Sequence, residues 1–79
     1  MLKAHPEITS NPAIMLGKPC IAGSRLTVEA ILRRLAEGLS PAEIVAEYPI
    51  IKETDVQAAI AFAADFIASE GLVGAVAAE

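Results

Sequence analysis

The apolar positions of residues 28–37 recur every three or four residues, which is the spacing of one buried face of a helix. This face consists of Val28, Ile31, Leu32 and Leu35. Thr27 stands where a helix N-cap is expected, and Gly38 stands where a left-handed residue commonly ends a helix. The pattern therefore predicts a first helix over residues 28–37.

A second helix is indicated directly after the first. Ser40 and Glu43 have the spacing of a capping box, and Pro41 occupies the first helical position, where its missing N–H costs nothing. Pro49 ends the pattern, because the residue before a proline avoids the helical region. We expect a helix of about two turns, with a buried face of Ile44, Val45 and Tyr48.

A third and longer helix is predicted over residues 53–70. Glu53 and Asp55 suit the positive end of its dipole, whereas Lys52 at the cap position does not. The expected inner stripe is Val56, Ala59, Ile60, Ala63 and Ile67, with Phe62 and Phe66 to one side. The expected outward residues are Glu53, Thr54, Gln57, Ala58, Ala61, Asp65 and Ser69.

The remaining residues lie at the two ends of the chain. Residues 1–26 contain turn signals at Ser10-Asn11-Pro12, Gly17 and Gly23, and three short apolar runs at 8–9, 13–16 and 20–21 that suit brief strands. Gly71 is expected to end the third helix, and residues 72–78 are apolar and uncharged, with no cap or period, so we expect them to be covered or paired as a strand.

These elements predict a mainly α fold: a small three-helix helix-turn-helix domain, homeodomain-like or winged-helix-like, with short N-terminal β segments. Since the chain has 79 residues, one domain is expected over 1–79. Within it, residues 1–26 form strands and turns, 27–70 form the helix-turn-helix core, and 71–79 form the apolar tail.

The composition indicates in which compartment the protein works and whether its surface faces a partner. Apolar residues make up 54% of this short chain, which suggests that some apolar surface faces a partner. Cys20 is the only cysteine, as suits a reducing cytosol, and we read it as a small buried hydrophobe. No segment has the length of a membrane span or the pattern of a signal peptide, so we expect a cytoplasmic protein.

The inventory of reactive side chains argues against an enzyme. His5 is the only histidine, and it lies fifteen positions from Cys20 in an end expected to be flexible. No metal-ligand spacing and no paired carboxylates beside a nucleophile occur. Gly17-Lys18 lacks the upstream glycine of a phosphate loop. We expect no catalytic residue, no metal and no cofactor.

Two sets of candidate binding residues remain. The net charge of −4 argues against strong nonspecific binding to nucleic acid, and acids on the third helix suit DNA reading poorly. Arg25 stands out because a cation near a helix N-terminus opposes the dipole and suits an acidic partner or a phosphate. The candidate DNA-binding residues are Lys18, Arg25, Arg33, Arg34 and Lys52. The candidate partner or homodimer interface is Ile8, Ile14, Ile21, Phe62, Phe66, Leu72 and Val73.

The stretch from Gly17 to Val28, with its Gly-Lys-Pro-Cys-Ile turn, its Gly-Ser-Arg and its capping Thr27, resembles the domain-of-unknown-function 433 family. The resemblance continues through residues 35–40, 43–44, 48–49 and 55–60 and spans about residues 5–67. Three positions depart from the family pattern: Leu16 replaces a frequent glycine, Ser24 a usual Thr, and Lys52 a usual Thr cap.

The family is similar to bacterial antitoxins paired with a small PIN-like nuclease. The resemblance therefore implies an antitoxin of a type II toxin-antitoxin pair, which neutralises its cognate PIN-like toxin and, as a dimer or complex, represses its own operator. Two alternatives stay open: a stand-alone helix-turn-helix transcriptional regulator, supported by the helix order and the basic residues, and a structural dimerisation module without a DNA role.

Overall fold

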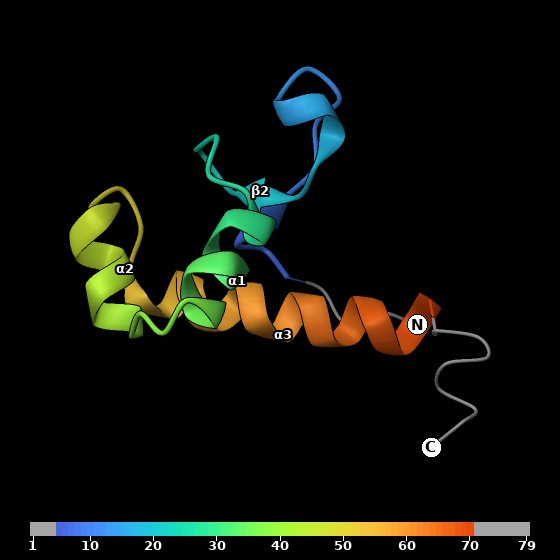
Figure 1. Cartoon of the computed structure of the whole chain (residues 1–79). Helices are drawn as coiled ribbons and strands as arrows, with labels where there is room; N and C mark the ends of the chain where they lie inside the picture. The colour runs from blue at the N-terminus through green and yellow to red at the C-terminus, as the bar shows by residue number, and fades with distance from the viewer. Residues whose placement is uncertain (1–4, 71–79) are drawn as a thin grey trace.

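Three helices and a short two-stranded sheet make up residues 5–70, the part of the chain that the computed structural model describes (Figure 1). This mainly helical fold with a short N-terminal sheet is the predicted fold class. In chain order the elements are β1 (Ile8–Thr9), the 3₁₀ helix η1 (Met15–Gly17), β2 (Cys20–Ile21), α1 (Val28–Ala36), α2 (Pro41–Glu47) and α3 (Glu53–Glu70).

The two short helices begin at the predicted caps. The Thr27 side chain accepts a hydrogen bond of 3.0 Å from the backbone N–H of Ala30 at the start of α1. At the start of α2, the Ser40 hydroxyl accepts from the Glu43 N–H at 3.1 Å, and the Glu43 carboxylate accepts from the Ser40 N–H at 2.8 Å. Gly38, with φ of +100°, follows α1 in the left-handed region. The capping signals are therefore confirmed.

The third helix begins without a hydroxyl cap. Lys52 precedes it, and the backbone N–H of Lys52 donates to the Asp55 carboxylate at 2.9 Å. This contact is one half of a capping box, in which the acidic residue reaches back to the chain before the helix. Asp55 thus compensates in part for the cap that Lys52 cannot provide.

The core lies where the three helices and β2 meet. Its buried members are Ile21, Val28, Ile31, Ile44, Ile51, Val56 and Ala59. The predicted inner stripe of α3 is correct at Val56 and Ala59 but wrong at Ile60 and Ile67, which are 39% and 50% exposed. The buried face follows the spacing 56, 59 and 62, because the partner helices pack on that side.

Two core residues were not expected there from the sequence patterns. Ile51 was assigned to no element, and Ile21 was a candidate interface residue. Ile51 lies in the connection between α2 and α3 and is 2% exposed. Ile21 is 4% exposed and packs in the core, which corrects its prediction as an interface residue. β2 holds it there by pairing antiparallel with β1, with Ile8 opposite Ile21.

The segment between the two strands does not form the strand predicted over residues 13–16. Residues 15–17 form a 3₁₀ turn instead, and Met15 and Leu16 have φ of +50° and +58°. Leu16 is 93% exposed. A left-handed backbone cannot continue a strand, so the apolar character of residues 13–16 does not reflect a sheet.

The helices differ in length, and this difference shapes the molecule. Figure 1 shows α3 running past both α1 and α2, so that its C-terminal part lies beyond the other helices. The 18 residues of α3 span roughly 27 Å, twice the length of α1. The second half of α3 therefore presents side chains that the three-helix core does not enclose.

Candidate functional site

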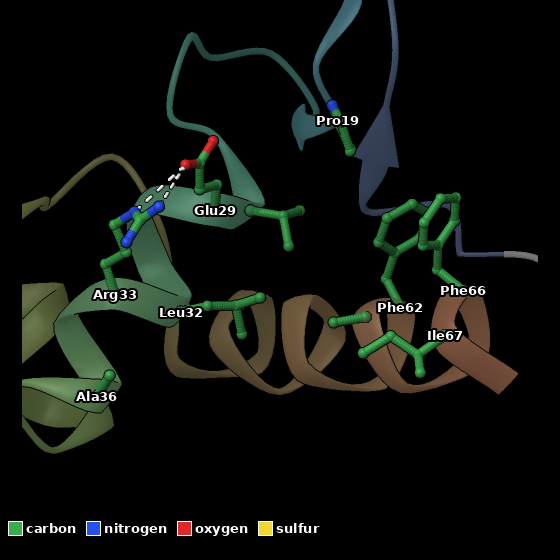
Figure 2. A pocket seen from close by; sticks show the side chains of 10 residues that line it. Pro19, Glu29, Leu32, Arg33, Ala36, Phe62, Phe66 and Ile67 are labelled. Carbon is green, nitrogen blue, oxygen red and sulfur yellow. Dashed lines mark hydrogen bonds and ion pairs between the residues drawn. The ribbon is translucent and has the colours of Figure 1, made fainter. Parts of the chain in front are cut away.

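An open apolar groove lies between α1 and the C-terminal half of α3. Its volume is about 410 Å³, within the range of pockets that enclose small ligands. The wall side chains come from both helices and from the turn before β2 (Figure 2). The residues that line it are Pro19, Val28, Glu29, Leu32, Arg33, Ala36, Phe62, Ala63, Phe66 and Ile67.

The first wall consists of one stripe of α1. Val28, Leu32 and Ala36 are spaced four residues apart, so they lie along the same side of the helix. Ile31 is fully buried in the core instead. One helix therefore serves two purposes: one side packs in the core, and the neighbouring side lines the groove.

The second wall carries the aromatic pair of α3. The rings of Phe62 and Phe66 stack with their centroids 6.2 Å apart and an interplanar angle of 21°. Both rings rise from α3 toward Pro19 in Figure 2. Phe62 is half-buried against the core, whereas Phe66 is 46% exposed. Phe62 therefore packs against the core, whereas Phe66 lies at the open surface.

An unpredicted contact of His5 holds this aromatic end in place. His5 Nε2 lies 2.8 Å from the Asp65 carboxylate, and the side chains are 11% and 33% exposed. The imidazole also meets the Phe62 ring edge-on, with centroids 5.7 Å apart. Asp65 was predicted to face outward, but its carboxylate instead contacts His5. The contact fastens the N-terminal segment to α3.

The polar rim of the groove is a network of two ion pairs that share the Glu29 carboxylate. Glu29 receives the Lys18 ammonium at 3.0 Å and the Arg33 guanidinium at 3.0 Å. Hydrogen bonding from Lys18, and then from Arg33, lowers the pKa of the Glu29 carboxyl below its ordinary value. All three side chains are exposed. Because two cations share one carboxylate, the rim keeps a net positive charge.

A family model described as "Protein of unknown function (DUF433)" matches residues 8–63, which is more than two thirds of the chain. The chain belongs to the DUF433 family. No curated protein and no solved structure gives a significant match. The DUF433 match covers α1, the rim and Phe62, and it ends before Phe66 and Ile67 at the far end of the groove.

Arg34, one of the candidate DNA-binding residues of this DUF433 chain, is engaged within the fold. Its guanidinium lies 3.2 Å from Glu37 and 3.1 Å from Glu47. The Tyr48 hydroxyl, followed by the charge of Glu47, raises the pKa of Arg34 above its ordinary value. These contacts tie the end of α1 to the end of α2. Like Lys18 and Arg33, Arg34 already has carboxylate partners.

Arg25 and Lys52 differ from those three cations. Both are exposed, and neither forms an ion pair within residues 5–70. Arg25 lies in the turn after β2, where the Ser24 hydroxyl donates to the Ile21 carbonyl at 2.8 Å. The turn borders an open hollow lined by Thr9, Ile14, Gly23, Ser24, Arg25 and Ile50.

The other candidate interface residues fall into separate places. Ile8 and Ile14 are half-buried, Ile8 against the core and Ile14 in the hollow beside Arg25. Leu72 and Val73 lie outside the described residues. The structure therefore brings Phe62 and Phe66 together in one groove and does not join them with Ile8 or Ile14.

The described part of the chain contains no candidate metal site and no candidate membrane span. Within residues 5–70, no group of three His, Cys, Asp or Glu side chains is arranged to hold a metal ion. None of the helices there has the length and apolar character to cross a membrane. Cys20 is buried, and its thiol donates to the Lys18 carbonyl at 3.4 Å, as suits a structural residue.

Proposed function

We propose that this DUF433 protein is a non-catalytic, protein-binding module of the antitoxin type. It would bind its cognate PIN-like nuclease through the groove between α1 and α3 and hold that enzyme inactive. The single observation that carries the proposal is the groove, with its aliphatic wall on α1 and half-exposed Phe66 and Ile67 on α3. Aromatic and aliphatic side chains surrounded by a polar rim are typical of protein-protein interfaces.

Charge supports a protein partner over nucleic acid at this groove. Glu29 and Arg33 pair with each other beside it, and the lining between them and Ile67 is apolar. Phosphate contacts are made mainly by polar and cationic donors, whereas Arg33 is the single cation among the described residues that line the groove, and Glu29 already binds it. The net charge of −4 also suits a nuclease with a basic substrate-binding surface.

Co-expression with the adjacent open reading frame tests the proposal. If that frame encodes a small acidic-triad nuclease, the two proteins should co-purify, and the complex should have less nuclease activity than the free enzyme. Absence of a complex, with both proteins folded, would overturn the proposal.

Two charge-introducing variants make the test specific to the groove. Phe66→Glu places a carboxylate on the apolar wall and should abolish co-purification. Leu16→Glu is the matched control, because Leu16 is an exposed apolar residue on the 3₁₀ turn away from the groove. Equal loss of the complex in both variants would contradict the groove as the binding site.

A second candidate function is operator binding, either as a dimeric antitoxin or as a stand-alone regulator. The observation that favours it is the pair of cations without carboxylate partners within residues 5–70, Arg25 and Lys52. For a promoter fragment, Arg25→Ala and Lys52→Ala should each reduce the salt slope by about one unit. Arg33→Ala is the control, because Glu29 already binds that guanidinium. An unchanged slope in both variants would remove Arg25 and Lys52 as phosphate contacts.

A further inference from the structure

One side of α3 carries a stripe that reads the same in both chain directions. Ile60, Ala63, Ala64 and Ile67 follow the spacing i, i+3, i+4 and i+7, so they lie along one side of the helix. Ile60 and Ile67 are 39% and 50% exposed, Ala64 is exposed and Ala63 is half-buried. We propose that these four residues, the α3 stripe, form the interface of a homodimer and pack antiparallel against the α3 stripe of a second copy.

The order of the four residues suits a twofold axis. In an isologous dimer, a surface patch meets an identical patch on the other subunit. With the axis between positions 63 and 64, Ile60 of one copy faces Ile67 of the other, and Ala63 faces Ala64. Alanines at the crossing point allow the two helix axes to approach to about 8 Å, and the isoleucines then close the contact on both sides.

The charges of α3 favour a second copy over a foreign partner. From Val56 to Ser69, Asp65 is the single charged residue. It lies about 150° round the helix from the centre of the stripe, where it contacts His5. Near a twofold axis each charge meets its own copy, and such like-charge contacts oppose association. The uncharged α3 stripe avoids this repulsion, whereas a partner recognised by charge would need a charged residue there.

The surroundings of α3 leave room for another helix. In Figure 1, α1 and α2 lie beside the N-terminal half of α3, and its C-terminal half extends beyond both. A helix that is apolar on most of its sides is typical of one with neighbours on most of its sides. In the proposed dimer, α3 of the second copy supplies the neighbour that α1 and α2 do not provide.

The contact between the two stripes is short. From Ile60 to Ile67, α3 rises by roughly 11 Å, so the interface is at the small end of the range for specific complexes. We therefore expect a dimer that dissociates in the micromolar range.

The dimer also bears on the proposed partner site. Ala63 and Ile67 belong to the α3 stripe and also line the groove. A nuclease that binds the groove therefore competes with the second copy. This consequence rests on the proposed function, whereas the dimer itself is measured without any partner.

Sedimentation equilibrium of the full chain, from micromolar to near-millimolar concentration, tests the dimer. Ala64→Glu places two carboxylates beside the axis and should weaken the dimer at least tenfold. Ala61→Glu is the matched control, because Ala61 is also exposed on α3 but lies about 110° round the helix from the centre of the stripe. It should leave the dissociation constant unchanged.

Circular dichroism checks that both variants keep the fold. A folded wild-type protein that stays monomeric up to near-millimolar concentration would overturn the proposal. If both glutamate variants weaken the dimer equally, or neither weakens it, the interface lies elsewhere and the proposal is also wrong.

A charge exchange tests the antiparallel register. Ala64→Lys alone should be as monomeric as Ala64→Glu, because it also brings like charges together beside the axis. An equal mixture of the two variants should form a heterodimer, since position 64 of one copy lies beside position 64 of the other. If the mixture does not associate while the wild-type protein is dimeric, the proposed register is wrong.

A nuclease partner distinguishes this proposal from the proposed function. If the nuclease fails to bind the wild-type protein, the proposed function is wrong and the dimer result stands. If the nuclease binds but the free protein is a monomer, the dimer alone is wrong.

Discussion

Leu16 combines two unfavourable features at one residue. Its backbone has φ of +58° and ψ of +29°, and its side chain is 93% exposed. A left-handed conformation costs a non-glycine residue roughly 1–2 kcal/mol. Glycine adopts it freely, at an entropic cost of roughly 0.5–1 kcal/mol in the unfolded chain.

Leu16→Gly should therefore stabilise the protein by about 0.5–1 kcal/mol, the difference between relieved strain and added chain entropy. Urea-induced unfolding measures the change. Leu16→Ala is the control, because alanine also removes the exposed apolar side chain but retains the left-handed strain. Equal stabilisation by alanine would assign the gain to the side chain and contradict the backbone argument.

The contact between His5 and Asp65 should contribute measurably to folding, since the imidazole is nearly buried. In a double-mutant cycle with His5→Ala and Asp65→Ala, we expect a coupling energy of about 1 kcal/mol. The exposed pair of Glu29 and Arg33 is the control cycle, with an expected coupling of only about 0.3–0.5 kcal/mol. Coupling near zero for the His5 pair would mean that the N-terminal segment is not fastened to α3.

Single residues were the hardest to place from sequence alone. His5 and Asp65 are separated by sixty positions, and no local pattern relates them. Ile51 follows Pro49 and Ile50 in a connection, where periodicity has no meaning, although it is 2% exposed. Their surroundings arise only after the helices have packed, so neither propensity nor spacing carries the information.

At the scale of elements, helix boundaries were predictable because their signals are local. Ser40, Pro41 and Glu43 define the start of α2 through atoms within four residues. The buried face of α3 was only partly predictable, because that helix is apolar on more than one side. Ile60 and Ile67 fit a helical stripe as well as Phe62 does, and only the direction from which α1 packs distinguishes them.

The start of α3 offers a direct test of capping. Lys52→Thr supplies a hydroxyl before the helix and completes the capping box with Asp55, which already accepts from the Lys52 N–H. We expect stabilisation of about 0.5–1 kcal/mol, measured as the free energy of unfolding in urea. Lys52→Ala removes the same charge without providing an acceptor and should give less than half of that gain. If the two variants gain equally, relief of the lysine charge rather than capping explains the effect.

Across the whole molecule, the groove follows from unequal helix lengths. α1 has 9 residues and α3 has 18, so the core cannot cover the second half of α3. The sequence placed Phe62 and Phe66 to one side of the inner stripe, but it did not predict the groove. That feature depends on where α1 crosses α3 and on Val28, Leu32 and Ala36 facing the aromatic pair.

Phe62 should contribute mainly to the free energy of unfolding, and Phe66 mainly to the binding of a partner. Phe62 is half-buried against the core and in contact with His5, so Phe62→Ala should cost about 3 kcal/mol of unfolding free energy. Phe66 is 46% exposed, and its truncation should cost about 1 kcal/mol or less of stability. The same Phe66→Ala change should weaken binding to the cognate partner by about 2 kcal/mol, or roughly thirtyfold. Urea unfolding and titration of the partner measure the two quantities separately. A large loss of stability in Phe66→Ala with unchanged affinity in the folded protein would place this ring in the core and remove it from the interface.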